Sequence, residues 1–279
     1  MQYPFSDTRI NHGYVCRAAD DTAFFTAEAL NQKSGVSHGF STRLGGVSPA
    51  PYDSLNLGWS RPDPEENIAR NFQIFCDAAK IDRESMVIVN YEHGGTVLKV
   101  TKDDRGRGFD KEPLAFCDGL VTNDENVVLI TSHADCGAFF LYDPVKRAVG
   151  LAHAGWKGTL ARIGARAVEL MQKEYGSDPK DILVSTGPCI CKNCFEVDLE
   201  LAERFADEFG TKGLYEHGRE GKAQLDLEAA AAIQILDVGI KPENLTLMHA
   251  CTYELETYFF SHRRDKGDTG SMAAYICLK

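Results

Sequence analysis

Two histidines and one cysteine in this 279-residue sequence have side chains that commonly bind metals, and each follows an apolar stretch. His93 follows the short run 86–89, Cys136 follows a run that ends at residue 132, and His153 follows the second apolar run beyond it. A hairpin would bring Cys136 and His153 to one end of a sheet. Zn²⁺ accepts imidazole nitrogen and thiolate sulfur, and a catalytic zinc keeps its fourth position open. Buried cysteines and histidines are also common without a metal, so the spacing alone leaves both interpretations open.

The composition is typical of a globular protein, with 43% hydrophobic and 25% charged residues. The formal net charge of −11 leaves no excess of cations to contact phosphates, which argues against binding to nucleic acid or to an anionic membrane. No apolar run approaches the roughly 20 residues that span a bilayer, and segment 1–16 lacks the apolar region of a secretion signal. Nine cysteines cannot all pair within one chain. We therefore expect a cytoplasmic protein with reduced thiols.

Periodicity and turn signals predict interspersed helices and strands. Asp63 and Pro64 are typical of the start of a helix, as N-cap and first helical residue, and Asp226 is typical of another N-cap. Helices are predicted over 64–79, 159–175, 199–209 and 227–236, and strands over 86–89, 127–132, 138–142, 148–152, 182–185, 245–248 and 273–278. Because these elements do not alternate strictly, we expect an α+β (mixed α/β) fold with mixed sheets flanked by helices. No repeat or linker divides the chain, so a single domain over residues 1–279 is expected.

This chain contains the stretches HGFSTRLGGVSPAPYDSLNLG (38–58), TKDDRGRG (101–108), CDGLVTN (117–123), ADC (134–136), AHAGWKG (152–158) and SHRRDKGDTGSMAAYI (261–276). Together they resemble the YfiH/YlmD family of laccase-domain, polyphenol oxidase-like proteins. The resemblance covers nearly the whole chain. It implies that His93, Cys136 and His153 bind zinc, with copper as a second metal that the site could take. The family commonly has Gln-Val-His-Gly at the first ligand, whereas this chain has Tyr91-Glu92-His93-Gly94, so contacts of that glutamine are not carried over.

The family is associated with purine nucleoside phosphorolysis and adenosine deamination. The resemblance therefore implies a zinc-dependent purine nucleoside phosphorylase for adenosine, inosine or methylthioadenosine, with adenosine deamination as a further activity. A purine nucleoside and phosphate are the expected partners, and we expect a monomer. The guanidinium group binds oxyanions in a bidentate manner, so Arg43, Arg263 and Arg264 are candidates for phosphate binding. The alternative for the last two is a solvated charged turn.

Polar residues near the expected metal are candidates for substrate contact or proton transfer. Asn56 could hydrogen-bond a base or sugar, or stabilise its own turn. Asp135 precedes one metal ligand and could act on protons or orient that ligand. His133 and His262 are further candidates for proton transfer.

Three other functions remain open from the sequence. A copper-dependent polyphenol oxidase is the older view of the family, but the eight histidines contain no His-x-His pair. A thiol hydrolase would use Cys136 as nucleophile and His153 as base. A non-catalytic protein would use zinc for folding only, although such sites normally have four protein ligands.

The segment CICKNC contains a second arrangement of cysteines. Cys191 and Cys194 have the spacing of half a structural zinc site, and Cys251 could add a third thiolate. No second CxxC or HxxxH motif follows. The sequence therefore predicts that these cysteines are incidental.

Overall fold

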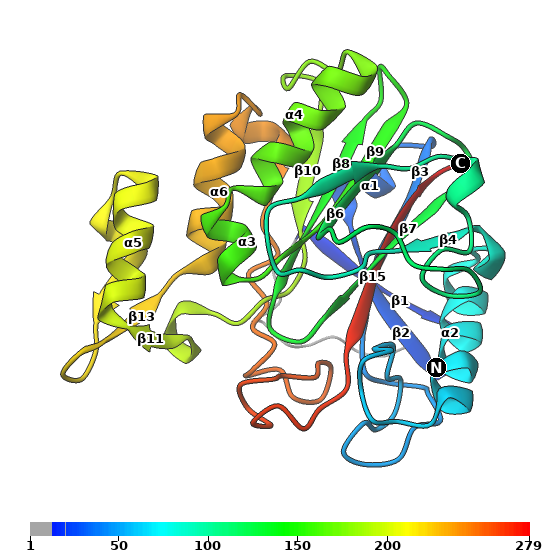
Figure 1. The fold of residues 1–279 in the computed structure, drawn as a ribbon, viewed down its shortest axis with the longest axis horizontal. Coiled ribbons are helices and arrows are strands. Elements are labelled where there is room, and N and C mark those ends of the chain that lie inside the picture. The colour runs from blue at the N-terminus through cyan, green and yellow to red at the C-terminus, as the bar shows by residue number, and fades with distance from the viewer. Residues whose placement is uncertain (1–12, 20) are drawn as a thin grey trace.

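Two six-stranded sheets form the centre of the computed structural model, which describes residues 13–19 and 21–279 (Figure 1). The first sheet has the order β1 (Tyr14–Ala19), β2 (Thr22–Ala27), β3 (Val36–Ser41), β15 (Met272–Leu278), β7 (Val128–His133) and β4 (Met86–Ile88). The second has the order β14 (Leu245–Thr246), β10 (Leu183–Thr186), β8 (Gly137–Asp143), β9 (Ala148–Ala154), β6 (Gly119–Thr122) and β5 (Val97–Lys99). Each combines antiparallel and parallel pairs, which confirms the predicted mixed α/β fold.

The main core lies between these two sheets. Phe40 and Leu129 of the first sheet pack in one buried cluster with Phe140 and Leu151 of the second. Apolar side chains on the opposite faces of the two sheets belong to separate clusters, because strand residues alternate between faces. Both sheets are therefore covered on two sides.

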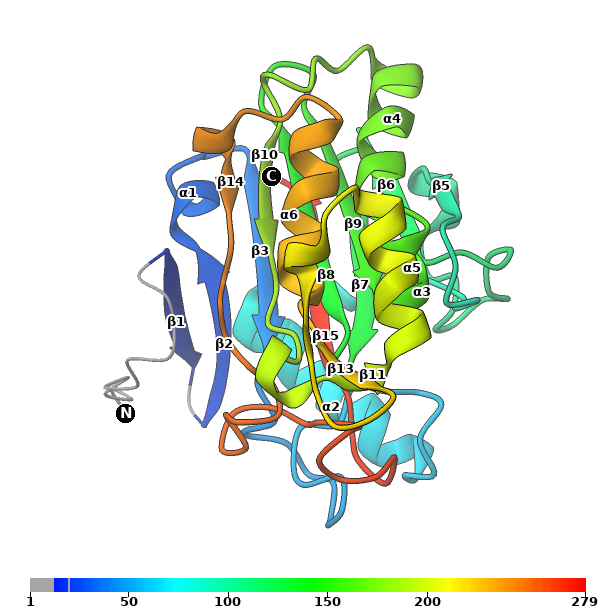
Figure 2. The same ribbon diagram turned by 90° about the vertical axis from the view of Figure 1, so that its left-hand side faces the viewer.

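Helices cover the outer faces of the sheets. α2 (Glu65–Ala79) packs Phe72 and Phe75 against the first sheet, and α4 (Ile163–Tyr175) packs Val168 against the second beside α6 (Leu227–Asp237). Figure 2, turned by 90°, shows α4 and α6 in front of the second sheet, with α2 behind it. The short helices are α1 (Glu28–Asn31) and α3 (Trp156–Leu160).

A smaller unit lies beside this body (Figure 1). It consists of α5 (Leu199–Phe209) and the sheet of β11 (Glu196–Asp198), β13 (Lys222–Leu225) and β12 (Tyr215–His217). Phe205 of α5 packs on Leu225 of β13 and on Ala230 of α6, which attaches the unit to the main body.

Most predicted elements are present, and two predicted details are wrong. The helix over 199–209 is confirmed. The Asp226 N-cap is also confirmed, since its carboxylate accepts a hydrogen bond from the Ala229 amide at 2.9 Å. The predicted helix 159–175 is instead two helices, because Arg162 between them has a left-handed backbone with φ 57°. Asp63 does not cap α2, and Pro64 is the N-cap residue rather than the first helical residue. The Asp63 carboxylate instead accepts hydrogen bonds from the side chains of Ser48 and Asn67.

No helix within residues 13–19 and 21–279 is long and apolar enough to cross a membrane.

Candidate active site

His93, Cys136 and His153 border one cavity of about 690 Å³. His93 lies beyond β4, Cys136 lies between β7 and β8, and His153 is in β9. Because β8 and β9 are antiparallel neighbours, with Gly137 opposite Ala154, Cys136 comes beside His153 at one end of the sheet. The predicted hairpin geometry is therefore confirmed for this pair.

Glycine at position 155 allows this close approach. A β-carbon there would lie 2.9 Å from the Cys136 sulfur, closer than such contacts normally occur. The glycine of the AHAGW stretch thus provides space for the sulfur next to the backbone that follows His153.

A buried carboxylate, Asp118, orients both histidines. Its Oδ1 lies 3.2 Å from Nδ1 of His153, and the amides of His93 and Gly94 donate to its two oxygens at 3.1 and 2.7 Å. With Nδ1 held by Asp118, the other ring nitrogen of His153 is left for Cys136, with which His153 also forms a side-chain hydrogen bond. Carboxylates that fix a metal-binding histidine in this way are common in metal sites. The sequence analysis did not select Asp118, although it lies in the family-like stretch CDGLVTN.

In the group of Asp118, His153 and Cys136, charges and hydrogen bonds oppose the effect of burial on the pKa values. Burial alone would lower the pKa of His153, but the charges and hydrogen bonds of Cys136 and Asp118 outweigh it and raise that pKa to about 9. Burial raises the pKa of Asp118, yet the hydrogen bonds from His153 and Gly94 leave it below its ordinary value. Burial and the neighbouring His153 lower the pKa of His93.

The donor set fits a borderline-soft divalent cation. Two imidazoles and one thiolate match the three protein ligands of a catalytic zinc site, and the same set also accepts copper. The rings of His93 and His153 have centroids 5.5 Å apart. Among the described residues, one group of three or more potential metal ligands has all its donor atoms within 4.8 Å of one another. That group does not contain His93, Cys136 or His153. The donor atoms of His93, Cys136 and His153 therefore do not all lie within this distance of one another.

Cationic and aromatic side chains complete the cavity. Arg263, predicted for phosphate binding, lies there with its guanidinium 5.1 Å from the Phe195 ring. Arg61, which the sequence analysis did not select, borders the same cavity, and its Nε donates to the Ser271 hydroxyl at 3.2 Å. The apolar part of the wall consists of Tyr91, Trp156, Ile190, Phe195, Val197, Leu201 and Leu227.

Three predicted residues do not reach this cavity. Asn56 is fully buried, donates to Asp63 and accepts from the Gly58 and Ser271 amides, so its side chain stabilises a loop rather than contacting a ligand. Arg43 and Arg264 border a separate, more acidic hollow with Asp53, Glu256 and Asp265. Both guanidinium groups bond to carboxylates and backbone carbonyls, and these two arginines therefore connect loops.

The candidates for proton transfer differ in their positions. Asp135 borders the cavity, but its two oxygens accept hydrogen bonds from the Thr252 hydroxyl and the Arg263 amide, both at 2.7 Å. His133 is buried, and its ring nitrogens bond the Thr131 hydroxyl at 2.7 Å and the Cys136 carbonyl at 3.0 Å. These contacts indicate that Asp135 and His133 support the loop around Cys136. His262 borders the cavity.

The fold and this site define a mixed α/β protein in which two histidines and a cysteine border a cavity that also carries arginines. The family model described as "Multi-copper polyphenol oxidoreductase laccase" matches residues 37–279, and the chain therefore belongs to this family, which includes the YfiH and YlmD proteins. It is 36% identical over 264 residues to "Purine nucleoside phosphorylase YlmD" of Bacillus subtilis, covering 91% of this chain and 92% of that protein. It is 34% identical to human "Purine nucleoside phosphorylase LACC1" over 87% of this chain and 55% of that protein. The crystal structure of YlmD from Geobacillus stearothermophilus superposes with a TM-score of 0.90 at 31% identity, covering 95% of this chain and 99% of that one.

Proposed function

We propose that this protein is a metal-dependent purine nucleoside phosphorylase whose reaction takes place in the cavity bordered by His93, Cys136 and His153. The observation that carries the proposal is the oriented Asp118–His153–Cys136 group in a cavity that also contains Arg61 and Arg263. Relatives at 30–37% identity are named purine nucleoside phosphorylases, which supports the same reaction. The volume of about 690 Å³ is within the range of small-molecule sites.

The reaction requires three kinds of group. A phosphate oxygen attacks C1′ of the ribose, the bond from C1′ to the purine N9 breaks, and the departing base takes up a proton. Arg61 and Arg263 can bind the phosphate, since guanidinium groups bind oxyanions at two points. Trp156 and Phe195 can stack on the purine. His262 borders the same cavity and is the candidate to supply the proton.

His93, Cys136 and His153 would hold the metal, and Asp118 would fix the ring of His153 toward it. A zinc ion there would act as a Lewis acid, and it could also activate water for the deamination of adenosine. Adenosine, inosine and methylthioadenosine are the proposed substrates.

The test is to incubate zinc-loaded protein with inosine and phosphate and to measure hypoxanthine and ribose 1-phosphate. We expect stoichiometric formation of both, none without phosphate, and loss of activity together with loss of the zinc bound at this cavity in Cys136→Ala and in His153→Ala. Full activity of a Cys136→Ala protein that has lost the zinc of this cavity would refute the metal-dependent reaction.

Two outcomes would favour other functions. Oxidation of phenols that depends on added copper, without phosphorolysis, would support a polyphenol oxidase, as the name of the family model suggests. Rapid alkylation of Cys136 in zinc-loaded protein with loss of a hydrolase activity would support a thiol hydrolase.

A further inference from the structure

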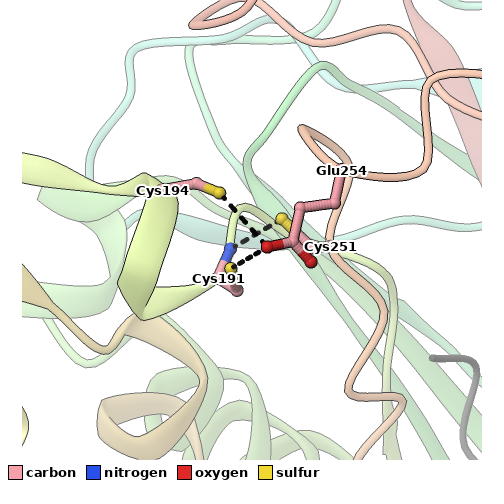
Figure 3. Close-up of side chains that lie close together, drawn as sticks. All are labelled: Cys191, Cys194, Cys251 and Glu254. Atoms are coloured by element: carbon pink, nitrogen blue, oxygen red, sulfur yellow. Dashed lines mark hydrogen bonds between the residues drawn. The ribbon is translucent and has the colours of Figure 1, made fainter.

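A second group of potential metal ligands lies outside the candidate active site. Cys191, Cys194, Cys251 and Glu254, here called the cysteine cluster, have donor atoms that all lie within 4.8 Å of one another (Figure 3). Cys191 precedes a short 3₁₀ turn and Cys194 is its last residue, and the other two residues come from a segment about sixty positions later in the chain. The chain therefore supplies the two ligands that the motif CICKNC lacks by itself.

Two of the separations in the cysteine cluster agree with those in a tetrahedral zinc site. Zinc–sulfur bonds of about 2.3 Å and zinc–oxygen bonds of about 2.1 Å at tetrahedral angles place neighbouring ligand atoms about 3.6–3.8 Å apart. The sulfurs of Cys194 and Cys191 lie 3.6 and 3.9 Å from Oε1 of Glu254. The Glu254 carboxylate is therefore as close to these two sulfurs as a shared zinc ion would require.

The backbone holds the two segments together independently of any metal. Cys189 and Cys251 form an isolated parallel bridge, in which the Cys189 amide donates to the Ala250 carbonyl at 3.2 Å and the Thr252 amide donates to the Cys189 carbonyl at 3.1 Å. The Cys191 amide donates to the Cys251 sulfur at 3.3 Å. This bond directs the Cys251 sulfur toward the turn that carries Cys191 and Cys194.

We propose that the cysteine cluster binds one Zn²⁺ through three thiolates and the Glu254 carboxylate, as a closed structural site. All four positions are supplied by the protein, unlike the three-ligand set at the cavity, and thiolate-rich tetrahedral sites select zinc. The evidence for this site does not depend on the reaction proposed above. The expectation that the cysteines of CICKNC are incidental is accordingly replaced.

The position of the cysteine cluster gives this zinc a role in shaping the cavity. Ile190 precedes the first ligand, Phe195 follows the second, and both border the candidate active site. Thr252, next to Cys251, donates to the Asp135 carboxylate at 2.7 Å. The zinc would thus fix two segments that form the cavity wall and support the loop around Cys136.

Metal analysis of the full-length protein tests the site. In a Cys136→Ala/His153→Ala background, which removes the candidate active-site ligands, we expect one zinc per chain. Adding Cys194→Ser or Cys251→Ser should remove it, whereas Cys16→Ser, a cysteine on β1, should retain it. Cobalt in place of zinc should give thiolate charge-transfer absorption that the Cys194→Ser change abolishes. Unchanged zinc content in both cysteine variants, or a Cys191–Cys194 disulfide in protein purified without oxygen, would refute the proposal.

Glu254→Gln provides a test in protein that keeps all its cysteines. Glu254 is exposed, so its replacement should not unfold the chain. We expect zinc to dissociate about tenfold faster to a competing chelator than from Glu256→Gln, a matched change at an exposed acid two positions away. Equal release rates in the two variants would exclude Glu254 as a ligand.

Discussion

Asp118 contacts both histidines of the candidate active site from a fully buried position. Its hydrogen bond to Nδ1 of His153 fixes which ring nitrogen faces Cys136, and its bonds to the His93 and Gly94 amides fix the adjacent loop. Since the backbone of His93 is left-handed, with φ 57°, these amide bonds also stabilise a conformation that histidine rarely adopts. Asp118 is therefore a positioning residue for both ligands.

Replacing Asp118 with asparagine should weaken zinc binding at the cavity. The amide keeps the size of the side chain but lacks the charge that orients and polarises His153, and loss of such a partner typically costs about 10–100-fold in metal affinity. Competition with a chelator measures the affinity, and kcat/KM for inosine should fall by a similar factor. Asp110→Asn, at an exposed position, is the control. Equal zinc affinities in the two variants would contradict the assigned role of Asp118.

Arg61 should contribute to phosphate binding. Its guanidinium group is partly buried beside the cavity and is positioned by Ser271 and by the Gly267 carbonyl at 3.4 Å. Lysine at this position keeps the charge but loses the fork that binds an oxyanion at two points. We expect Arg61→Lys to raise the KM for phosphate about tenfold and to leave the KM for inosine nearly unchanged. Arg105→Lys, at an exposed position away from the cavity, should change neither constant. An unaltered KM for phosphate in Arg61→Lys would exclude this contact.

Sequence reasoning identified only some of the residues that border the cavity. Cys136 and His153 could be paired because a hairpin has a regular geometry. Arg61 and Arg43 have the same chemistry and both precede turns, so only the folded loops reveal that one reaches the cavity and the other pairs with Asp53. Asn56 was selected for its polarity, which the fold uses in a buried hydrogen-bond network.

At the scale of elements, local sequence signals were sufficient to predict a helix whose bounds depend on its own residues. The helix over 199–209 has an amphipathic pattern and ends at Gly210, and its predicted bounds are those observed. The break at Arg162 has no such signal, because its left-handed backbone is stabilised by ion pairs of its side chain with Glu208 and Asp237 on two other helices. The three-stranded sheet also escaped prediction, since each of its strands has only three or four residues.

The C-terminus of α2 offers a direct test of local backbone strain. Lys80 follows this helix with φ 56° and ψ 46°, a left-handed conformation that costs a residue with a β-carbon about 1 kcal/mol, and its side chain is exposed. Lys80→Gly should raise the free energy of unfolding by about 0.5–1 kcal/mol and Tm by about 2 °C, as measured by thermal and denaturant unfolding. Lys80→Ala, which keeps the β-carbon, should give no gain. Equal stabilities of the glycine and alanine variants would show that the strain is absent.

At the scale of the whole molecule, the packing of one sheet on the other buries a titratable group. His38 on β3 is 3% exposed, and its ring lies 5.8 Å from that of Phe140 in the facing sheet. Its Nε2 accepts a hydrogen bond from the Ala27 amide at 2.7 Å, which requires the neutral ring. Burial, with smaller contributions from the charges of Lys279 and Arg17, lowers the pKa of His38 to about 3.

This burial should make the stability of the whole fold depend on pH in a defined direction. His38 stays neutral in the folded protein, whereas in the unfolded chain it takes up a proton as the pH falls through its ordinary value of 6.5. Its contribution is therefore complete above about pH 6.5 and is lost progressively as the pH falls toward about 3. Between about pH 7.5 and about pH 5.5, one such group removes about 1.4 kcal/mol from the free energy of unfolding.

Denaturant unfolding of the wild type should show this excess loss relative to His38→Gln, whose side-chain oxygen can still accept a hydrogen bond from the Ala27 amide. His217→Gln, at an exposed histidine, should follow the wild type. Because other titrating groups and any bound metal are common to all three proteins, equal losses in wild type and His38→Gln would mean that the ring is protonated inside the fold.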